Sequence, residues 1–447
     1  MKQLRIKPLL LISVALIIMG CKFGEPNNQN GDLVSYLTSK ATEINTSADI
    51  DELIEKAGDK RLKLLGEASH GTHEYYVWRD SISRRLISEK GFSFIAVEGD
   101  WASLYELNRY VKDMDGAAGS AREVLGNLTR WPLWMWGNEE VEGLIEWLRE
   151  YNMDKSFEDK VGFYGMDVYD EWNSKDALLS FLDKNSLQLY EEARSLYGCF
   201  APYNRDSWEY ARGVQMGRPD CTAQTAGVVE LLQGSRYDLD VCDYEFLYAK
   251  QNAYVVKYAE KFYRKSIASR GPESWNSRVQ HMHNTVGRLL EYYGDDAKGI
   301  VWAHNTHVGD ARATDMARGG QVNIGQLSRE SLGKDNVFIT GFGTFRGTVK
   351  AGRQWGQRMQ RLNVPDAHPD SYEFLLNQVP YKNFMLIIDE QDRQHEDFNR
   401  IRGHRAIGVV YNPEREVPGN YVITLLPERY DAFIFFEETK ALSPIPR

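Results

Sequence analysis

Short apolar runs rich in β-branched and aromatic residues alternate along the chain with longer stretches of helical periodicity. The runs span residues 62–65, 92–97, 161–165, 300–303, 337–340, 384–388, 406–411 and 432–436. Residues 74–89 and 139–151 repeat apolar side chains at helical spacing. Strands that alternate with helices predict an α/β fold with a mostly parallel sheet flanked by helices. The last three runs lie closer together, and we expect them to form a mixed edge or a small second unit.

The segment from about residue 170 to 296 departs from this alternation. Aromatic-rich helical stretches at 244–265 and 277–293 predict a helical insert subdomain laid over the sheet. A loop-like region rich in Gly, Pro and Arg comes before them. It holds Cys199 and Cys221, and with Cys242 these cysteines allow one disulfide and leave one thiol over.

The first 45 residues indicate export and attachment to a membrane. Lys2, Arg5 and Lys7 precede an apolar run of about a dozen residues, which is shorter than the roughly 20 that span a bilayer. We therefore expect a signal peptide over 1–20. The run ends in IMGC, which resembles a bacterial lipobox and predicts a lipid on Cys21. Residues 21–45 would then be the lipid-attached tether, and 46–447 the α/β domain of a protein anchored in the cell envelope, facing the periplasm or the surface.

Charge narrows the choice of partners. The chain of 447 residues has 54 Lys and Arg against 64 Asp and Glu, a formal net charge of −10. An acidic surface repels phosphate backbones, so we expect no nucleic-acid partner. Hydrophobic residues make up 42%, which is the composition of an ordinary globular protein.

Titratable residues follow four of the predicted strands. Glu67 ends the first strand, with His70 three residues on, and Glu98 ends the second. Asp167 ends the third. His304 ends the fourth, again with a histidine, His307, three residues later. Because the carboxyl ends of parallel strands share one edge of a sheet, where ligands bind, we expect these side chains to meet in one crevice. The simpler alternative is that strands need polar residues where they reach the surface.

His70 is the expected general base of this crevice. An imidazole with a pKa of about 6.5 suits proton removal near neutral pH. A carboxylate on its other ring nitrogen would fix the tautomer, with Glu67 as the local candidate and Glu98 as the remote one. Arg79 could hold a carboxylate or a developing oxyanion. The alternatives are a histidine that caps the next helix and a surface ion pair for Arg79.

Two further features leave alternatives open. His70 and His73 are spaced H-x-x-H, as are His304 and His307, so a metal site built from the two pairs must be considered. The segment is not the H-E-x-x-H helix of zinc proteases, and we expect no metal and no cofactor. Trp131 and Trp134 are expected either in the core or as the apolar wall of a substrate pocket.

With these residues in place, the chain resembles the erythromycin esterase family. The similar motifs are LLGEASHGTHEYY (64–76), AVEGDW (96–101), RWPLWMW (130–136), FYGMDVYD (163–170), WAHNTHVGDAR (302–312) and the terminal RAIGVVYNPERE and YDAFIFFEET. They run in family order over roughly residues 50–440. GEASHG together with WAHNTH is a specific pair.

The resemblance implies metal-independent hydrolysis of a macrolide lactone or a similar small-molecule ester. The position of His70 is that of the base that activates water. Glu67, Arg79, Glu98 and His304 match positions around it, and His307 and Asp167 are expected to support substrate binding. The resistance esterases are similar to this core but cytoplasmic, so the lipoprotein-like signal is a departure. The rival interpretations are a haem- or tetrapyrrole-binding lipoprotein and a metal-dependent hydrolase.

Overall fold

A nine-stranded sheet runs through the centre of the protein, which we describe from a computed structural model that covers residues 30–446. The predicted signal peptide and Cys21 lie outside the described residues. In spatial order the strands are β1 (Ala41–Glu43), β8 (Asn383–Ile387), β11 (Ala432–Thr439), β6 (Val337–Ala351), β2 (Leu62–Leu65), β5 (Gly299–Trp302), β3 (Phe94–Asp100) and β4 (Gly162–Asp167). β7 (Gln360–Val364) pairs with the far end of β6.

The six strands from β11 to β4 are parallel, and β8 lies antiparallel between β11 and the edge strand β1. Every residue of β2, β3, β4 and β5 is buried, as expected for parallel strands covered on both faces. The prediction of a mostly parallel α/β sheet is therefore confirmed. Since these strands share one direction, their carboxyl ends open at the same edge.

The prediction of a strand at residues 406–411 is wrong. The strand here is β9 (Arg402–Arg405), which pairs with β10 (Tyr421–Thr424) in a separate two-stranded sheet. Ile407 and Tyr411 instead pack in a small apolar cluster with side chains of β6 and β7. Its backbone pairs with neighbouring segments through isolated bridges, including one from Ser69 to Ile407, and not through a strand ladder. Burial of its apolar side chains therefore does not require a strand.

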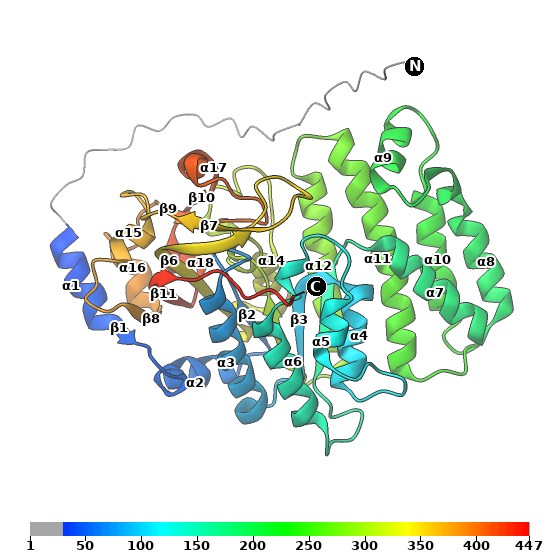
Figure 1. Cartoon of the computed structure of the whole chain (residues 1–447), viewed down its shortest axis with the longest axis horizontal. Helices are drawn as coiled ribbons and strands as arrows, with labels where there is room; N and C mark the ends of the chain where they lie inside the picture. The colour runs from blue at the N-terminus through cyan, green and yellow to red at the C-terminus, as the bar shows by residue number, and fades with distance from the viewer. Residues whose placement is uncertain (1–29, 447) are drawn as a thin grey trace.

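Helices cover both faces of the sheet (Figure 1). On one face lie α2 (Asp51–Gly58), α3 (His73–Lys90), α5 (Ala121–Gly126) and α6 (Glu139–Asn152). On the other lie α1 (Asn30–Lys40), α12 (Glu273–Tyr293), α14 (Ile324–Leu332), α15 (Tyr372–Leu376) and α18 (Leu426–Arg429), while α4 (Trp101–Val111) packs on β4 and contributes to both cores. The remaining short helices are α13 (Asn305–Val308), α16 (Glu390–Gln394) and α17 (Glu416–Gly419).

Residues 30–43, expected to belong to the tether, are part of the folded unit. α1 buries Leu33 and Leu37, which are four residues apart and therefore on one face of the helix. β1 then pairs with β8. Among the described residues, the folded unit therefore includes Asn30–Glu43 and does not begin at residue 46.

The insert forms a helical lobe beside the sheet, on the right in Figure 1. Its helices are α7 (Glu171–Asn185), α8 (Leu187–Tyr197), α9 (Ser207–Gln215), α10 (Thr222–Gly234) and α11 (Asp243–Ala268), packed around an apolar core of their own. A disulfide joins Cys199 to Cys221, and Cys242 is free and exposed. α11 packs along α12, so the lobe continues into a helix that covers the sheet.

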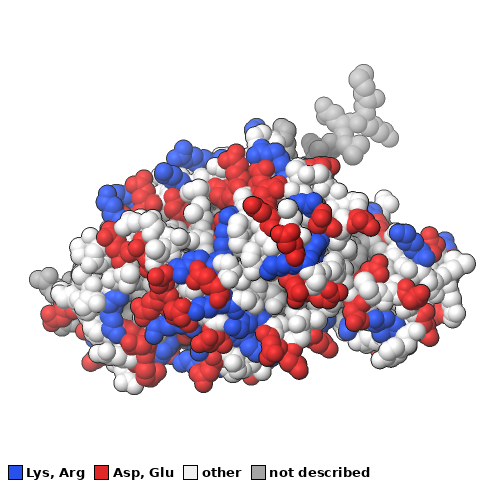
Figure 2. Space-filling view, turned by 90° about the horizontal axis from the view of Figure 1, so that it is seen from below, with Lys and Arg blue, Asp and Glu red and all other residues white. Residues whose placement is uncertain are grey.

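Two surface properties complete the description. Within residues 30–446 no helix has both the length and the apolar character needed to cross a membrane. Figure 2 shows acidic and basic side chains interspersed over one face of the molecule. That face carries no broad basic surface of the kind that binds nucleic acid.

Candidate active site

Two tight turns carry the catalytic candidates, one after β2 and one after β5. Gly66 follows β2, where a Cβ atom would collide with the side-chain oxygen of Asn305. Gly71 lies against the backbone of Lys350 and has no room for a side chain either. Gly66 therefore lets the loop that carries Glu67 and His70 pass close to the loop that follows β5, and Gly71 lets it pass close to β6.

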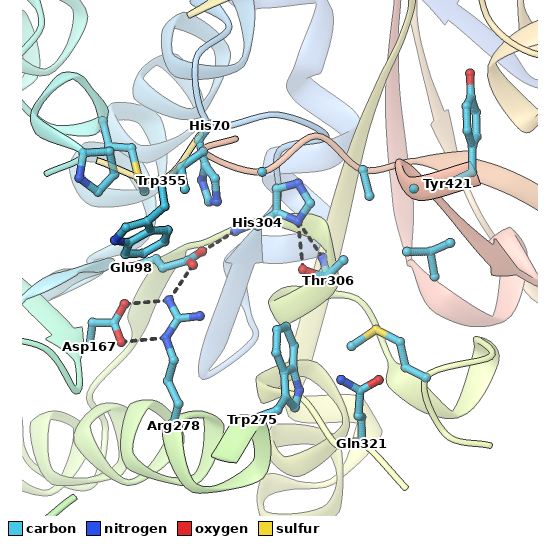
Figure 3. Close-up of a pocket in the computed structure, with 18 of the residues that line it drawn as sticks. His70, Glu98, Asp167, Trp275, Arg278, His304, Thr306, Gln321, Trp355 and Tyr421 are labelled. Atoms are coloured by element: carbon cyan, nitrogen blue, oxygen red, sulfur yellow. Dashed lines mark hydrogen bonds and ion pairs between the residues drawn. The ribbon is translucent and has the colours of Figure 1, made fainter. Parts of the chain in front are cut away.

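His70 is held by a carboxylate that is itself held by an arginine. His70 Nδ1 lies 2.9 Å from Glu67 Oε1, and Arg79 Nη2 donates to Glu67 Oε2 at 2.8 Å. Burial alone would lower the pKa of His70, but the charges of Glu98 and Glu67 outweigh it and raise that pKa above the usual 6.5. With Nδ1 engaged, Nε2 is the ring nitrogen left for chemistry, and the ring of His70 projects into the cavity (Figure 3).

Arg79 does not face the cavity, in contrast to its expected role near an oxyanion. Its side chain is fully buried between the rings of Tyr76 and Trp302, at 4.3 and 4.7 Å. Glu67 is buried as well and does not line the cavity. Both residues lie behind His70: Glu67 binds Nδ1 of its ring, and Arg79 binds Glu67.

Glu98 binds the backbone of His304, the second histidine that borders the cavity. Its Oε2 accepts the backbone N–H of His304 at 2.9 Å, and the rings of His70 and His304 lie 4.9 Å apart. Burial, followed by the charge of His70, holds the pKa of His304 well below 6.5, so this ring is neutral. The N–H of Thr306 donates to His304 Nδ1, which leaves the ring proton on Nε2.

Arg278, which the sequence did not indicate, organises the acidic side of the site. From α12 it donates to both oxygens of Asp167, at 2.8 and 2.6 Å, and to Glu98 Oε1 at 2.8 Å (Figure 3). Burial would raise the pKa of Asp167, but the Arg278 charge lowers it below its usual value. Burial likewise opposes ionisation of Glu98, yet the charges of His307, His70 and Arg278 hold its pKa well below normal. Both carboxylates are therefore ionised.

His307 supports Arg278 and does not reach the cavity wall. Its Nε2 lies 3.1 Å from Arg278 Nη1 and 3.3 Å from Glu98 Oε1. Trp275 stacks on its ring at 4.5 Å. The structure therefore places His307 behind Arg278 and Glu98 and not at the cavity wall where a substrate contact was expected.

The cavity at this edge of the sheet has a volume of about 1420 Å³. Its polar wall includes His70, Glu98, Asp100, Asp167, Arg278 and His304. Asp100 is paired with Arg130, another cavity residue absent from the predicted site. Most of the remaining wall is apolar, with Leu104, Leu133, Met135, Trp136, Trp275 and Met316 among its residues. A cavity of this size and character accepts a large, mainly apolar molecule.

Trp131 and Trp134 are not the wall of this cavity. Residues 133–135 form a 3-10 turn, in which side chains three residues apart lie on the same side. Trp131 and Trp134 thus contact each other, at 5.4 Å between ring centroids, while Leu133 and Trp136 line the cavity. Trp134 is buried in the core, and Trp131 packs against Trp355 at the cavity mouth.

The fold separates the two histidines of the first H-x-x-H pair, His70 and His73. His73 Nδ1 lies 2.6 Å from Glu140 Oε1 on α6 and does not line the cavity. Among residues 30–446, no group of three or more His, Cys, Asp or Glu side chains is arranged to hold a metal ion. The two pairs therefore do not combine into one metal site.

The structure thus places a carboxylate-supported imidazole at the wall of a large, mainly apolar cavity, an arrangement found in hydrolases. The family model for erythromycin esterase matches residues 87–439, and the chain belongs to the erythromycin esterase family, whose members hydrolyse ester bonds. Glu67, His70 and Arg79 precede the matched range.

Individual relatives are distant in sequence and close in fold. The chain is 23% identical to an erythromycin esterase type II of Escherichia coli over 340 residues, 71% of this chain and 78% of the relative. A Bacillus cereus protein of known structure is 21% identical, with a TM-score of 0.79 over 94% of this chain and all of its own. A succinoglycan biosynthesis protein is 22% identical, with a TM-score of 0.76 over 94% and 99% of the two chains. A mutant of erythromycin esterase EreC in its open conformation is 15% identical, with a TM-score of 0.65 over 91% and 99%.

Proposed function

We propose that this protein hydrolyses a carboxylic ester, a macrolide-like lactone, by metal-independent activation of water. The observation that carries the proposal is the chain from Arg79 through Glu67 to His70, which ends at the wall of a large, mainly apolar cavity. Membership of the erythromycin esterase family supports ester hydrolysis.

In the proposed mechanism His70 Nε2 takes a proton from a water molecule that attacks the ester carbonyl. Glu67 and Glu98 stabilise the imidazolium that forms. Arg278 borders the cavity and is the donor placed to stabilise the developing oxyanion. The Nε2 atom of His304 is buried, so its N–H is not exposed to the cavity. A positioned base contributes about 10² to 10⁴ in rate and one oxyanion donor about 10² to 10³.

The test is mass spectrometry of a panel of macrolides incubated with the purified protein. We expect at least one member to gain the mass of one water, at the same rate with and without a chelator. Loss of the product with chelator and its return with zinc would overturn metal independence. If no member of the panel is hydrolysed and a Soret band appears on haem titration, the tetrapyrrole-binding alternative replaces the proposed function.

We further propose that Cys21 carries a lipid and anchors the protein in the cell envelope. The support is the charged start and short apolar run that end in IMGC. Replacing Cys21 with Ser should move the protein from the membrane fraction to the soluble fraction of the envelope. A Cys21→Ser protein that remains in the membrane fraction to the same extent as the unchanged protein would contradict the proposal.

A further inference from the structure

The β6–β7 hairpin forms part of the cavity mouth. The two strands pair from Gly347 with Val364 to Ala351 with Gln360, and residues 352–359 connect them. Near the end of β6, just before the connecting loop, the N–H of Lys350 donates to the carbonyl of Gly71, at 2.9 Å, next to His70. At the tip of the hairpin Trp355 packs on Trp131 at 4.6 Å and lines the cavity. The hairpin is thus attached to the catalytic loop through β6 and borders the opening through its tip.

The hairpin is basic in an acidic protein. Residues 346–361 contain Arg346, Lys350, Arg353, Arg358 and Arg361 and no acidic residue, whereas the whole chain has a formal charge of −10. Arg346 pairs with Glu437. Arg353, Arg358 and Arg361 are exposed and form no ion pair with any residue in the part of the chain that the structure describes. Their charges are therefore available to an anionic partner.

Exposed apolar side chains from three separate segments gather at the same opening. They are Trp355 of the hairpin tip, 64% exposed, Ile401 before β9, 58%, and Val417 of α17, 56%, and all three line the mouth of the cavity. We name these three residues the collar. Single exposed apolar residues are common, but a group around one opening marks an interaction surface.

We propose that the collar and the hairpin arginines dock the mouth of the cavity on a membrane that contains anionic lipids. Tryptophan favours the headgroup level of a bilayer, aliphatic side chains enter the acyl boundary, and arginines gain from anionic headgroups. A nucleic acid does not fit as the partner, because it would not bury the apolar side chains of the collar in an apolar environment. In a symmetric dimer formed through this surface, the basic hairpins of the two copies would lie close together and repel each other. The docked cavity opens toward the phase in which apolar esters dissolve.

A chain that begins at residue 22 tests the docking apart from any lipid on Cys21, and it retains every residue of the described fold. We expect it to sediment with vesicles of phosphatidylcholine mixed with phosphatidylglycerol, not with phosphatidylcholine alone, and less at high salt. Each arginine near an anionic surface contributes about fivefold to binding, so the double variant Arg353→Glu, Arg358→Glu should partition at least about tenfold more weakly. Trp355→Ala should also weaken binding.

The matched control is the double variant Arg218→Glu, Arg270→Glu in the helical insert. Both residues are exposed, and the change in net charge is the same. This control should partition like the unchanged chain. Equal losses in the two double variants, equal binding to neutral vesicles, or no binding to the mixed vesicles would each overturn the proposal.

Discussion

At the scale of single residues, the proposed chemistry depends on the different surroundings of the two ring nitrogens of His70. Nδ1 is bound to Glu67, whose other oxygen is held by the buried Arg79. Nε2 faces the cavity. The neighbouring His304 is neutral because burial and the charge of His70 lower its pKa. The two imidazoles, 4.9 Å apart, thus differ in their tendency to take up a proton: the pKa of His70 is raised and that of His304 is lowered.

The raised pKa of His70 predicts the pH dependence of hydrolysis. Only the neutral ring accepts a proton, so kcat/KM should rise with pH through a pKa above the usual 6.5. Glu67→Gln keeps a hydrogen-bond acceptor but removes a charge, and should move this rise to lower pH. The same shift raises stability below pH 6.5, and that contribution is lost as pH rises through the folded-state pKa. An unchanged pH profile in Glu67→Gln would show that Glu67 does not set the pKa.

At the scale of elements, Asn305 of α13 connects the loops that follow β2 and β5. Its backbone N–H donates to the carbonyl of Glu67 at 2.8 Å, and its side chain donates to the carbonyl of Phe342 at 2.7 Å. His404 Nε2 lies 3.1 Å from Asn305 Nδ2, and His404 Nδ1 lies 2.5 Å from Glu373 Oε1. Burial lowers the pKa of His404, so its neutral ring can accept at Nε2. The buried His404–Glu373 pair thus holds Asn305, and Asn305 binds the loop that carries Glu67 and His70.

Replacement of His404 tests this connection. His404→Leu leaves the buried Asn305 amide and Glu373 carboxylate with fewer partners, which should cost about 1–3 kcal/mol of unfolding free energy. It should also lower kcat. His404→Gln keeps an acceptor and should recover part of both losses. Chemical denaturation and steady-state kinetics provide the readouts, and identical behaviour of the Leu and Gln variants would contradict the role.

The start of α7, where the helical lobe leaves the sheet, contains a buried acid with a separate effect on stability. Burial raises the pKa of Glu171 from 4.5 to about 8. The unfolded chain ionises at 4.5 and the folded chain at about 8, so stability falls as pH rises between them. Glu171→Gln should therefore increase the unfolding free energy at about pH 8 by roughly 1–3 kcal/mol and leave it unchanged at about pH 4. A gain of equal size at both pH values would contradict this explanation.

At the scale of the whole molecule, the sequence predicts those residues of the site that the parallel sheet brings together. Glu98, Asp167 and His304 end separate strands, and the common direction of the strands brings them to one edge. Arg278 could not be found in this way. It lies 111 residues after Asp167, on a helix whose contact with the strand ends arises only from tertiary packing. The same limit explains Trp131 and Trp134, since a tryptophan-rich segment does not reveal which side of a 3-10 turn faces the cavity. The sequence also does not predict that α1 packs on the sheet, because its few apolar residues lie among many polar ones.

The most direct measurement compares kcat for an ester hydrolysed by the unchanged protein with kcat for His70→Ala and for His73→Ala. His73 is the matched control, because it is the other histidine of the same segment but binds Glu140 away from the cavity. The account predicts a loss of at least about 100-fold in His70→Ala, activity near that of the unchanged protein in His73→Ala, and cooperative unfolding of both. A folded His70→Ala protein that retains its activity would contradict the account.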